Sequence, residues 1–343
     1  MRYKDYTLLN NVHTAQYHCR YMGEAGRWNV ENWEHEAPYM GKDWALRRTY
    51  FSPEGLYVRT KYNPNKTRWG ECRTLGEYKA NLLEMAEVHA LDIKQMKLIR
   101  LDFKIDVLDD RENYDRICKL CRLVVDCFLA SDSRIKPKKE SVSYSARTGE
   151  FESLSAHTKT WGITFYNKKL QKEAEGVAYR FEISRKGENA KSSSPEEYLA
   201  VMKKKLSQLA KQIEKAQQME NKKLLKQWQE TAPAKKDGRS INEFLRQNKE
   251  FIYTRAQLTA FYETVGKYEE RKAQIATRHF IERNQIEVLT KEEYREFIQV
   301  IIDLIEDYAS QNNVPERPIF GNAPAKKNIH QSKLRQRLEE LTA

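Results

Sequence analysis

Long hydrophobic runs are missing from this sequence. No stretch approaches the roughly 18 consecutive apolar residues of a transmembrane helix, so we expect no membrane span. The segment from Met1 to Leu9 is polar and lacks the apolar stretch of a secretory signal, which predicts a cytoplasmic protein. Hydrophobic residues nevertheless make up 40% of the chain, and this excludes a wholly disordered protein.

A disulfide framework is also missing. The five cysteines form an odd, scattered set, which agrees with a reducing compartment. Cys118 and Cys121 have the spacing of metal ligands, but no second pair or suitably spaced histidine follows them. Cys121 and Cys127 also fall at helical spacing among apolar residues. The buried face of a helix is therefore favoured over a zinc or redox site.

Positive charge is in excess. The 343 residues include 61 Lys and Arg against 49 Asp and Glu, which gives a net charge of +12. Such a balance favours a polyanionic partner, most often nucleic acid. It does not distinguish a protein that binds DNA from one that cuts it.

The predicted elements change character near Pro195. We predict an α+β fold, with a central antiparallel sheet and flanking helices in residues 1–195. A helical region for DNA binding or dimerisation follows in 196–313, and a basic tail in 314–343; residues 1–50 have no clear assignment. Strands are predicted at 56–62, 97–107, 140–146, 150–155, 160–167 and 178–185, and helices at 74–91, 112–131 and 194–228.

Helix starts are marked by capping pairs, in which a Ser or Thr and a later Glu or Gln satisfy each other's backbone amides. The pairs are Thr74/Glu77, Ser194/Glu197, Ser240/Glu243, Thr254/Gln257 and Thr290/Glu293.

The helical region has two open interpretations. The lysine-rich helix 199–228 has an apolar stripe, and its lysines could follow DNA phosphates or form a solvated face or dimer arm. In segment 241–310, an ordinary helical bundle is favoured over a DNA-reading unit.

Three predicted strands carry polar side chains on one face, because strand residues alternate between two faces. If these strands share a sheet, the opposite face is apolar and packs against helices. The shared polar face carries Arg100, Asp102, Lys104, Asp106, Tyr166, Lys168, Arg180 and Glu182.

These residue types suit phosphodiester chemistry. Carboxylates on neighbouring strands can hold a divalent cation that polarises a phosphate. A tyrosine hydroxyl can be a nucleophile, while Lys168 and Arg180 can stabilise charge on phosphate oxygens. A solvated sheet face with alternating salt bridges explains the same pattern, and the pattern alone favours that simpler interpretation.

Four short motifs follow one another between roughly residues 56 and 186. They are Tyr62-Asn-Pro-Asn-Lys66, Arg100-Leu-Asp-Phe-Lys-Ile-Asp106, Phe165-Tyr-Asn-Lys-Lys169 and Tyr179-Arg-Phe-Glu182. Their order resembles the rolling-circle replication initiators of Gram-positive plasmids (the Rep_trans type). The relaxases of some integrative elements and the filamentous-phage replication endonucleases are similar.

The resemblance implies that Tyr166 attacks one DNA strand at the origin, becomes joined to the 5′ phosphate and frees a 3′ hydroxyl for synthesis, with Lys168 in the same motif. It implies Mg²⁺ or Mn²⁺ held by Asp102, Asp106 and Glu182. Arg100, Lys104 and Arg180, with Lys136, Lys138 and Lys139 of a basic loop, are predicted to bind DNA.

Some features depart from the family pattern. No acidic residue closely follows Lys169, and the N-terminal and C-terminal segments match nothing in the family. The seven histidines contain no pair flanking one hydrophobic residue, so an all-acidic metal site fits better than a histidine site. His157, near the Tyr166 strand, is interpreted as a loop residue.

The expected partners are origin DNA, both double-stranded and extruded single-stranded, the host replicative helicase and a second copy of the chain. A conjugative relaxase would use the same chemistry. A non-catalytic DNA-binding regulator of replication is the alternative from another class.

Overall fold

The structure is a computed structural model. It describes residues 2–3, 6–22, 45–52, 55–66, 71–88, 91–108, 114–131, 140–144, 146, 151–170, 177–187, 194–231 and 238–313. In this part of the chain, no helix is long and apolar enough to cross a membrane.

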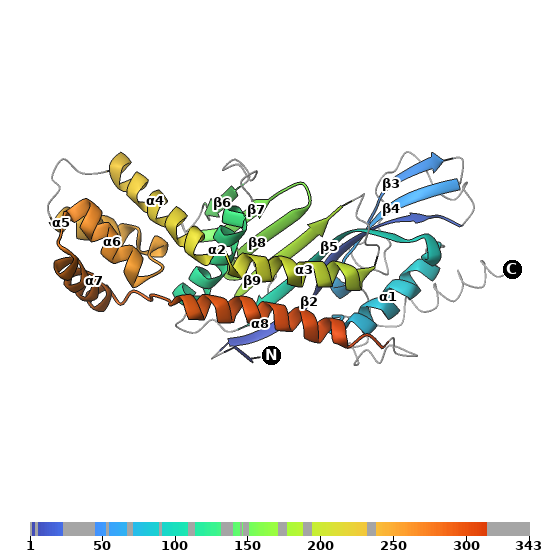
Figure 1. Cartoon of the computed structure of the whole chain (residues 1–343). Coiled ribbons are helices and arrows are strands. Elements are labelled where there is room, and N and C mark those ends of the chain that lie inside the picture. The colour runs from blue at the N-terminus through green and yellow to red at the C-terminus, as the bar shows by residue number, and fades with distance from the viewer. Residues whose placement is uncertain are drawn as a thin grey trace. The chain divides into compact units, whose positions relative to one another are not determined.

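An antiparallel sheet is the centre of the fold (Figure 1). The order of its strands is β3-β4-β2-β5-β9-β8-β7-β6, and β1 pairs with β2. The strands are β1 (Arg2–Tyr3), β2 (Tyr6–Arg20), β3 (Ala45–Ser52), β4 (Gly55–Tyr62), β5 (Lys97–Val107), β6 (Glu140–Tyr144), β7 (Phe151–His157), β8 (Trp161–Asn167) and β9 (Tyr179–Lys186).

Helices flank the sheet and then continue as a helical region, which confirms the α+β class predicted from the sequence. They are α1 (Leu75–Val88), α2 (Tyr114–Ser131), α3 (Pro195–Ala210), α4 (Ile213–Thr231), α5 (Gly238–Gln247), α6 (Arg255–Gly266), α7 (Glu270–Asn284) and α8 (Lys291–Ser310).

Strand β2 was not predictable from alternation. It lies within the segment of residues 1–50 that the sequence left unassigned, and it is 15 residues long. Its buried side chains include Asn11 and Thr14 beside apolar ones such as Val12 and Ala15. Because polar residues occupy buried positions, the strand shows no clear apolar and polar alternation.

The helix predicted from 194 to 228 is instead two helices. The amides of Lys211 and Gln212 donate to carbonyls three residues back, Gln208 and Leu209, and this tight turn separates α3 from α4. Neither Gly nor Pro occurs at the break, so no sequence signal marks it. The apolar stripe of the two helices, including Met202 and Leu206, is buried as expected.

Capping pairs form at most of the predicted helix starts. At α1, Thr74 Oγ1 accepts from the Glu77 amide at 3.1 Å, and Glu77 Oε2 accepts from the Thr74 amide at 3.2 Å. Matching pairs occur at Ser194/Glu197 and Thr290/Glu293. At α6, Thr254 Oγ1 accepts from the Gln257 amide, but Gln257 Oε1 accepts from the Tyr253 amide. The prediction at Ser240 is wrong, because α5 already begins at Gly238 and Ser240 lies inside the helix.

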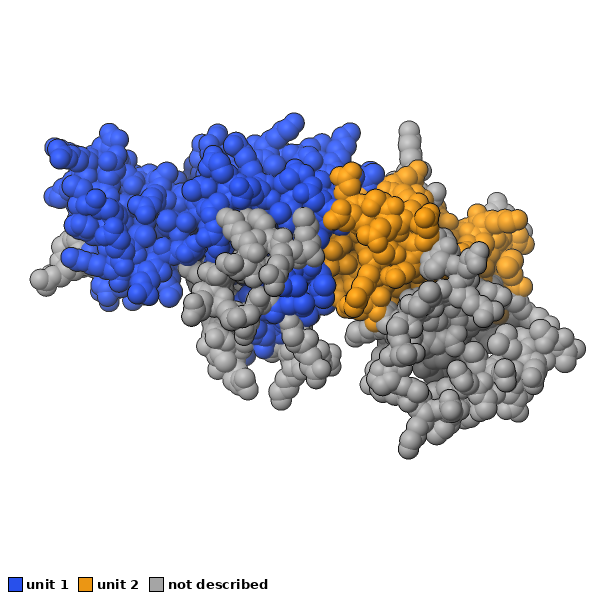
Figure 2. Space-filling view, turned by 90° about the horizontal axis from the view of Figure 1, so that it is seen from below, with its two compact units in different colours: residues 1–9, 105–183, 200–305 blue, residues 10–104, 184–199, 306–343 orange. Residues whose placement is uncertain are grey.

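The chain divides into two compact units, coloured separately in Figure 2. Unit 1 comprises 1–9, 105–183 and 200–305, and unit 2 comprises 10–104, 184–199 and 306–343. The division follows contacts in the fold, and several strands contribute to both units. The boundary placed at residue 195 from the sequence stays a prediction.

Unit 1 has a sheet core and a helical core. Helix α2 packs on β7 and β8, and α4 packs on α2. The second core gathers apolar side chains from α4 to α7, in which the rings of Phe244 and Phe261 stack at 5.7 Å and Trp228 meets Phe244 edge-on at 5.1 Å. A packed helical core of this kind is what the bundle interpretation predicts.

The cysteines of α2 belong to that packing. Cys118, Cys121 and Cys127 are buried, and none of the three is in a disulfide. Burial raises the pKa of the Cys121 thiol well above its usual value, as expected for a cysteine inside an apolar core. The buried helix face favoured from the sequence is confirmed.

Unit 2 is held together by buried aromatic and polar contacts. The ring of Phe103 on β5 meets Tyr308 of α8 at 5.5 Å. Tyr17 on β2 hydrogen-bonds Tyr78 on α1 at 2.5 Å, and burial raises the pKa of Tyr17 above its usual range. The apolar face of β5 therefore packs against a helix, as predicted.

Candidate functional site

Strands β5, β9 and β8 are neighbours in the sheet, as the predicted polar face requires. The Ala178 amide donates to the Val107 carbonyl at 2.8 Å, and the Lys168 amide donates to the Ala178 carbonyl at 2.9 Å. These bonds join the end of β5 to the start of β9 and to the turn after β8. The Tyr166 and Arg180 motifs are thereby held at one end of the three strands.

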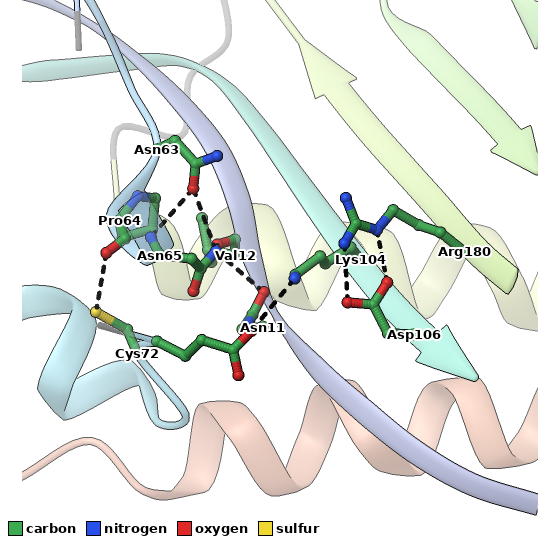
Figure 3. A network of polar contacts seen from close by, with 10 residues as sticks. Asn11, Val12, Asn63, Pro64, Asn65, Cys72, Lys104, Asp106 and Arg180 are labelled. Atoms are coloured by element: carbon green, nitrogen blue, oxygen red, sulfur yellow. Dashed lines mark hydrogen bonds and ion pairs between the residues drawn. The ribbon is translucent and has the colours of Figure 1, made fainter. Parts of the chain in front are cut away.

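The central contact of this site is the ion pair between Arg180 and Asp106 (Figure 3). Arg180 Nε donates to Asp106 Oδ1 at 2.5 Å, and Nη2 donates to Oδ2 at 3.0 Å. The side chains are 14% and 4% exposed, respectively. Both carboxylate oxygens are therefore engaged by one guanidinium in a largely buried pair, the strongest geometry for these groups.

Further charges surround Arg180. Burial by itself lowers the pKa of Arg180. The hydrogen bonds that Arg180 donates to Asp106 and the negative charges of Asp106, Glu182 and Tyr166 outweigh burial and raise the pKa. Glu182 is 9% exposed. Two carboxylates and the tyrosine hydroxyl thus lie within electrostatic reach of a single guanidinium. We call Tyr166, Lys168, Arg180, Asp106 and Glu182 the Arg180 cluster.

Tyr166 is only partly buried. It lies on β8 opposite Ser153 of β7. Lys168 Nζ lies over its ring, 5.2 Å from the centroid. A cation in this position can stabilise negative charge on a phenolate or on a nearby phosphate oxygen.

A second arginine–aspartate pair forms within β5 itself. Arg100 Nε donates to Asp102 Oδ1 at 2.8 Å, and Arg100 Nη2 lies 2.6 Å from Asp102 Oδ2. Burial and the positive charge of Arg100 lower the pKa of Lys186, while Asp102 opposes that shift. We call Arg100, Asp102 and Lys186 the Arg100 cluster.

Lys104 and the Tyr62–Lys66 motif make contacts that support the fold. Lys104, 4% exposed, lies 3.7 Å from Glu71. Asn63 Oδ1 accepts from the Asn65 amide at 3.1 Å, and Asn65 Nδ2 donates to the Val12 carbonyl at 2.7 Å (Figure 3). The motif is therefore a turn that its own asparagines tie to β2.

The solvated-face interpretation does not describe this surface. Asp102, Lys104 and Asp106 are 2%, 4% and 3% exposed. Such charges are expensive to bury unless they are paired, and Asp102 and Asp106 each have an arginine. Buried and paired charges beside a partly buried tyrosine are more typical of a functional site than of a solvent-exposed sheet face.

The predicted metal ligands do not form a ready cation site. Among the described residues, no three or more His, Cys, Asp or Glu side chains gather closely enough to hold a metal ion. Asp106 and Asp102 instead give both their oxygens to guanidinium groups. The donor set as it stands thus fits arginine and does not fit a divalent cation.

Two features were missed or misplaced from the sequence. Lys186 was not selected, because β9 was expected to end at residue 185 and in fact ends at Lys186. Alternation continued by one residue would have placed it with Arg180 and Glu182. His157 is the last residue of β7, opposite Gly162, and is not in a loop. The predicted DNA-binding residues Lys136, Lys138 and Lys139 lie outside the described residues, as does the tail 314–343.

The lysines of α3 and α4 divide into two groups. Lys205 donates to Ser131 at 3.0 Å, and Lys223 lies 3.6 Å from Asp126 and 2.7 Å from Glu220, so these two help to dock the helices on α2. Others are exposed to solvent: Lys204, Lys211, Lys215, Lys222 and Lys226. Part of the lysine-rich segment is therefore structural and part is open to a polyanion.

No family model matches the chain, and no curated protein does. Among solved structures, the chain is similar to one titled "Structure of Rolling Circle Replication Initiator Protein from Geobacillus stearothermophilus". The two are 14% identical, with a TM-score of 0.31, and the match covers 53% of this chain and 76% of that chain. A match this loose carries no functional argument.

Proposed function

We propose that this chain is a DNA nicking and closing enzyme that initiates rolling-circle replication. The observation that carries the proposal is the Arg180 cluster. Arg180 is hydrogen-bonded to the buried Asp106, and Glu182 and the partly buried Tyr166 lie within electrostatic reach of the same guanidinium. A binding-only protein has no need to place carboxylates beside a tyrosine, because phosphate contacts use cations and hydrogen-bond donors.

The proposed reaction is a transesterification. The Tyr166 oxygen forms a bond to a phosphorus atom of one DNA strand, and the bond from that phosphorus to the 3′ oxygen breaks. The phenol proton is released, and the departing 3′ oxygen gains a proton. One phosphodiester replaces another, so the same groups can run the reaction backwards and close the strand.

Arg180 and Lys168 would act on the charge that develops in this step. Arg180, which Asp106 holds in place through Nε and Nη2, would contribute its positive charge. Lys168 lies over the nucleophile's ring and offers a point charge beside it. Groups held by the fold before the substrate arrives need little reorganisation during the reaction, which favours catalysis.

Origin DNA is the substrate in this proposal. Mg²⁺ or Mn²⁺, the host helicase and a second copy of the chain stay predictions of the family resemblance. A conjugative relaxase would use the same groups for the same chemistry, and the choice between the two depends on which DNA the protein cuts.

The decisive experiment incubates the protein with supercoiled plasmid bearing its own origin and probes for protein joined to a 5′ phosphate. We expect an adduct with the natural protein, none with Tyr166→Phe, and normal adduct formation with Tyr57→Phe, a half-buried tyrosine of β4 outside the cluster. An adduct that persists in Tyr166→Phe would eliminate the nucleophile. DNA binding without any nick would favour the non-catalytic regulator.

A further inference from the structure

The outer face of α4 carries a row of cationic and amide side chains. Its members are all exposed to solvent: Lys215, Gln218, Lys222, Lys226 and Gln229. They follow one another at intervals of three or four residues, and side chains at these intervals lie one above the other on a helix. At a rise of about 1.5 Å per residue, the row is about 21 Å long. We call it the α4 stripe.

We propose that the α4 stripe binds the phosphate backbone of duplex DNA, through contacts that do not depend on base sequence. The stripe would hold duplex DNA whether or not the chain cuts it. The inference therefore goes beyond the proposed function, because Tyr166 takes no part in it.

Two of the three acidic residues of α4 are engaged by cations outside the stripe. Glu214 accepts a hydrogen bond from Lys291 at the start of α8. Glu220 is buried and lies 2.7 Å from Lys223. These carboxylates are thus already matched within the fold, and the positive charge of the stripe is in excess.

The lysines of the stripe also repel one another. Lys222 and Lys226 are four residues apart, a spacing at which two like charges destabilise a helix slightly. Glu230 lies 3.5 Å from Lys226, but the two side chains are 61% and 74% exposed, and an ion pair so exposed contributes little. A polyanion lying along the row would relieve this repulsion, because each lysine would then face a phosphate.

A second copy of the chain fits this face poorly. The apolar side of α4 is used inside the fold, where Ala216, Leu224 and Trp228 are 0%, 1% and 4% exposed. The stripe itself consists of lysine and glutamine, so two copies meeting through it would bring like charges together. Charge complementarity favours a polyanion over the dimer arm that the sequence left open.

Duplex DNA fits the stripe better than a single strand does. Proteins that hold single strands stack the bases on aromatic side chains, and the aromatic residue of α4, Trp228, is buried. The ammonium and amide groups of the stripe can instead donate to phosphate oxygens. A duplex offers these oxygens at high density, with one negative charge per about 1.7 Å of its axis.

The test measures binding of the full chain by fluorescence anisotropy. The probe is a labelled duplex of about 30 base pairs without the origin sequence, at salt concentrations between about 50 and 200 mM. The stripe variant carries Lys215→Gln, Lys222→Gln and Lys226→Gln. We expect the slope of log affinity against log salt to fall by about two to three, and the affinity at about 100 mM salt to fall by tenfold or more.

A matched control carries Lys94→Gln, Lys204→Gln and Lys249→Gln. It changes the net charge by the same amount, but its three exposed lysines come from separate elements, the 3₁₀ turns Ile93–Gln95 and Lys249–Phe251 and helix α3. We expect its slope to fall by less than one, because lysines that form no row do not contact successive phosphates.

Two further measurements separate binding from folding. Arginine at the same three stripe positions keeps the charge and should retain the natural affinity. The stripe variant should unfold at no lower temperature than the natural protein, because the replaced side chains are exposed and repel one another.

An unchanged slope in the stripe variant overturns the inference, as does an equal loss in the control, since net charge alone would then explain it. A loss of affinity for oligothymidylate but not for the duplex would assign the face to single strands. A lower mass of the stripe variant in sedimentation would assign it to a second copy. An adduct at Tyr166 would survive each of these results, and an adduct that persists in Tyr166→Phe would leave the α4 stripe untouched.

Discussion

Strand β5 carries Asp102 at its middle and Asp106 near its end, and each aspartate is held by an arginine through two contacts, but the surroundings of the pairs differ. In the Arg180 cluster, the arginine comes from β9 and is 14% exposed, and Glu182 and Tyr166 lie within its electrostatic reach besides Asp106. In the Arg100 cluster, the arginine is two residues away on the same strand, is 30% exposed and lies near a second cation, Lys186.

The difference in net charge suggests different tasks. In the Arg180 cluster, the largely buried guanidinium is already hydrogen-bonded to both oxygens of Asp106. The Arg100 cluster has two cations against one carboxylate, so it can accept a phosphate without displacing anything. An excess positive charge suits a contact that binds the DNA backbone, whereas paired charges near a tyrosine suit catalysis.

The largest expected effect is on nicking. Asp106→Asn should reduce the rate of adduct formation about a hundredfold or more, the usual scale for losing one charged group in a preorganised site. Asp102→Asn should cost clearly less, because Asp102 is paired in the other cluster. Single-turnover nicking of the origin plasmid measures both. Equal losses of nicking rate in the two variants would favour the three-carboxylate site that the family resemblance implies.

The two arginine–aspartate pairs should also differ in their contribution to the free energy of unfolding. Asp106→Ala leaves Arg180 without its buried partner and should lower the free energy of unfolding by about 3 kcal/mol. Asp102→Ala leaves the more exposed Arg100, which water can solvate, so about 1 kcal/mol is expected. Urea denaturation of both variants gives the comparison. A larger loss of stability for Asp102→Ala would show that the exposure of the arginine does not decide how much each pair stabilises the fold.

The salt dependence of DNA binding tests whether Arg100 contacts a DNA phosphate. Arg100→Gln should weaken oligonucleotide binding and reduce the slope of log affinity against log salt by about one, as expected for one phosphate contact. Arg185→Gln, on the opposite face of β9, should leave the slope unchanged. If only the second variant changes the slope, the DNA follows the other face of the sheet.

The smallest expected effect concerns Lys186. Its pKa is lower than the usual lysine value, chiefly through burial and then through Arg100. The folded protein therefore holds this proton less tightly than the unfolded chain, and the free energy of unfolding should rise with pH between the lowered and the usual pKa. Lys186→Met should remove that gradient and add a few tenths of a kcal/mol at neutral pH. A variant with an unchanged pH gradient would contradict this assignment.

Much of the fold was predictable because its signals are local. Strand β5 follows its predicted bounds, since apolar residues alternate along it, and the Thr74/Glu77 pair marks the start of α1. The local signals failed in two places. The strand β2 buries asparagine and threonine, and the break between α3 and α4 has no glycine or proline.

The sequence by itself determined which chemical groups are available and which face of each strand they occupy. Strand alternation places Asp102, Asp106, Arg180, Glu182 and Tyr166 on polar faces whatever the strand order. Only the tertiary structure decided which charges meet. Arg180 and Asp106 are 74 residues apart in sequence, and strand order alone brings β9 beside β5. Charge pairing depends on distance and burial, and neither quantity is written in a local pattern.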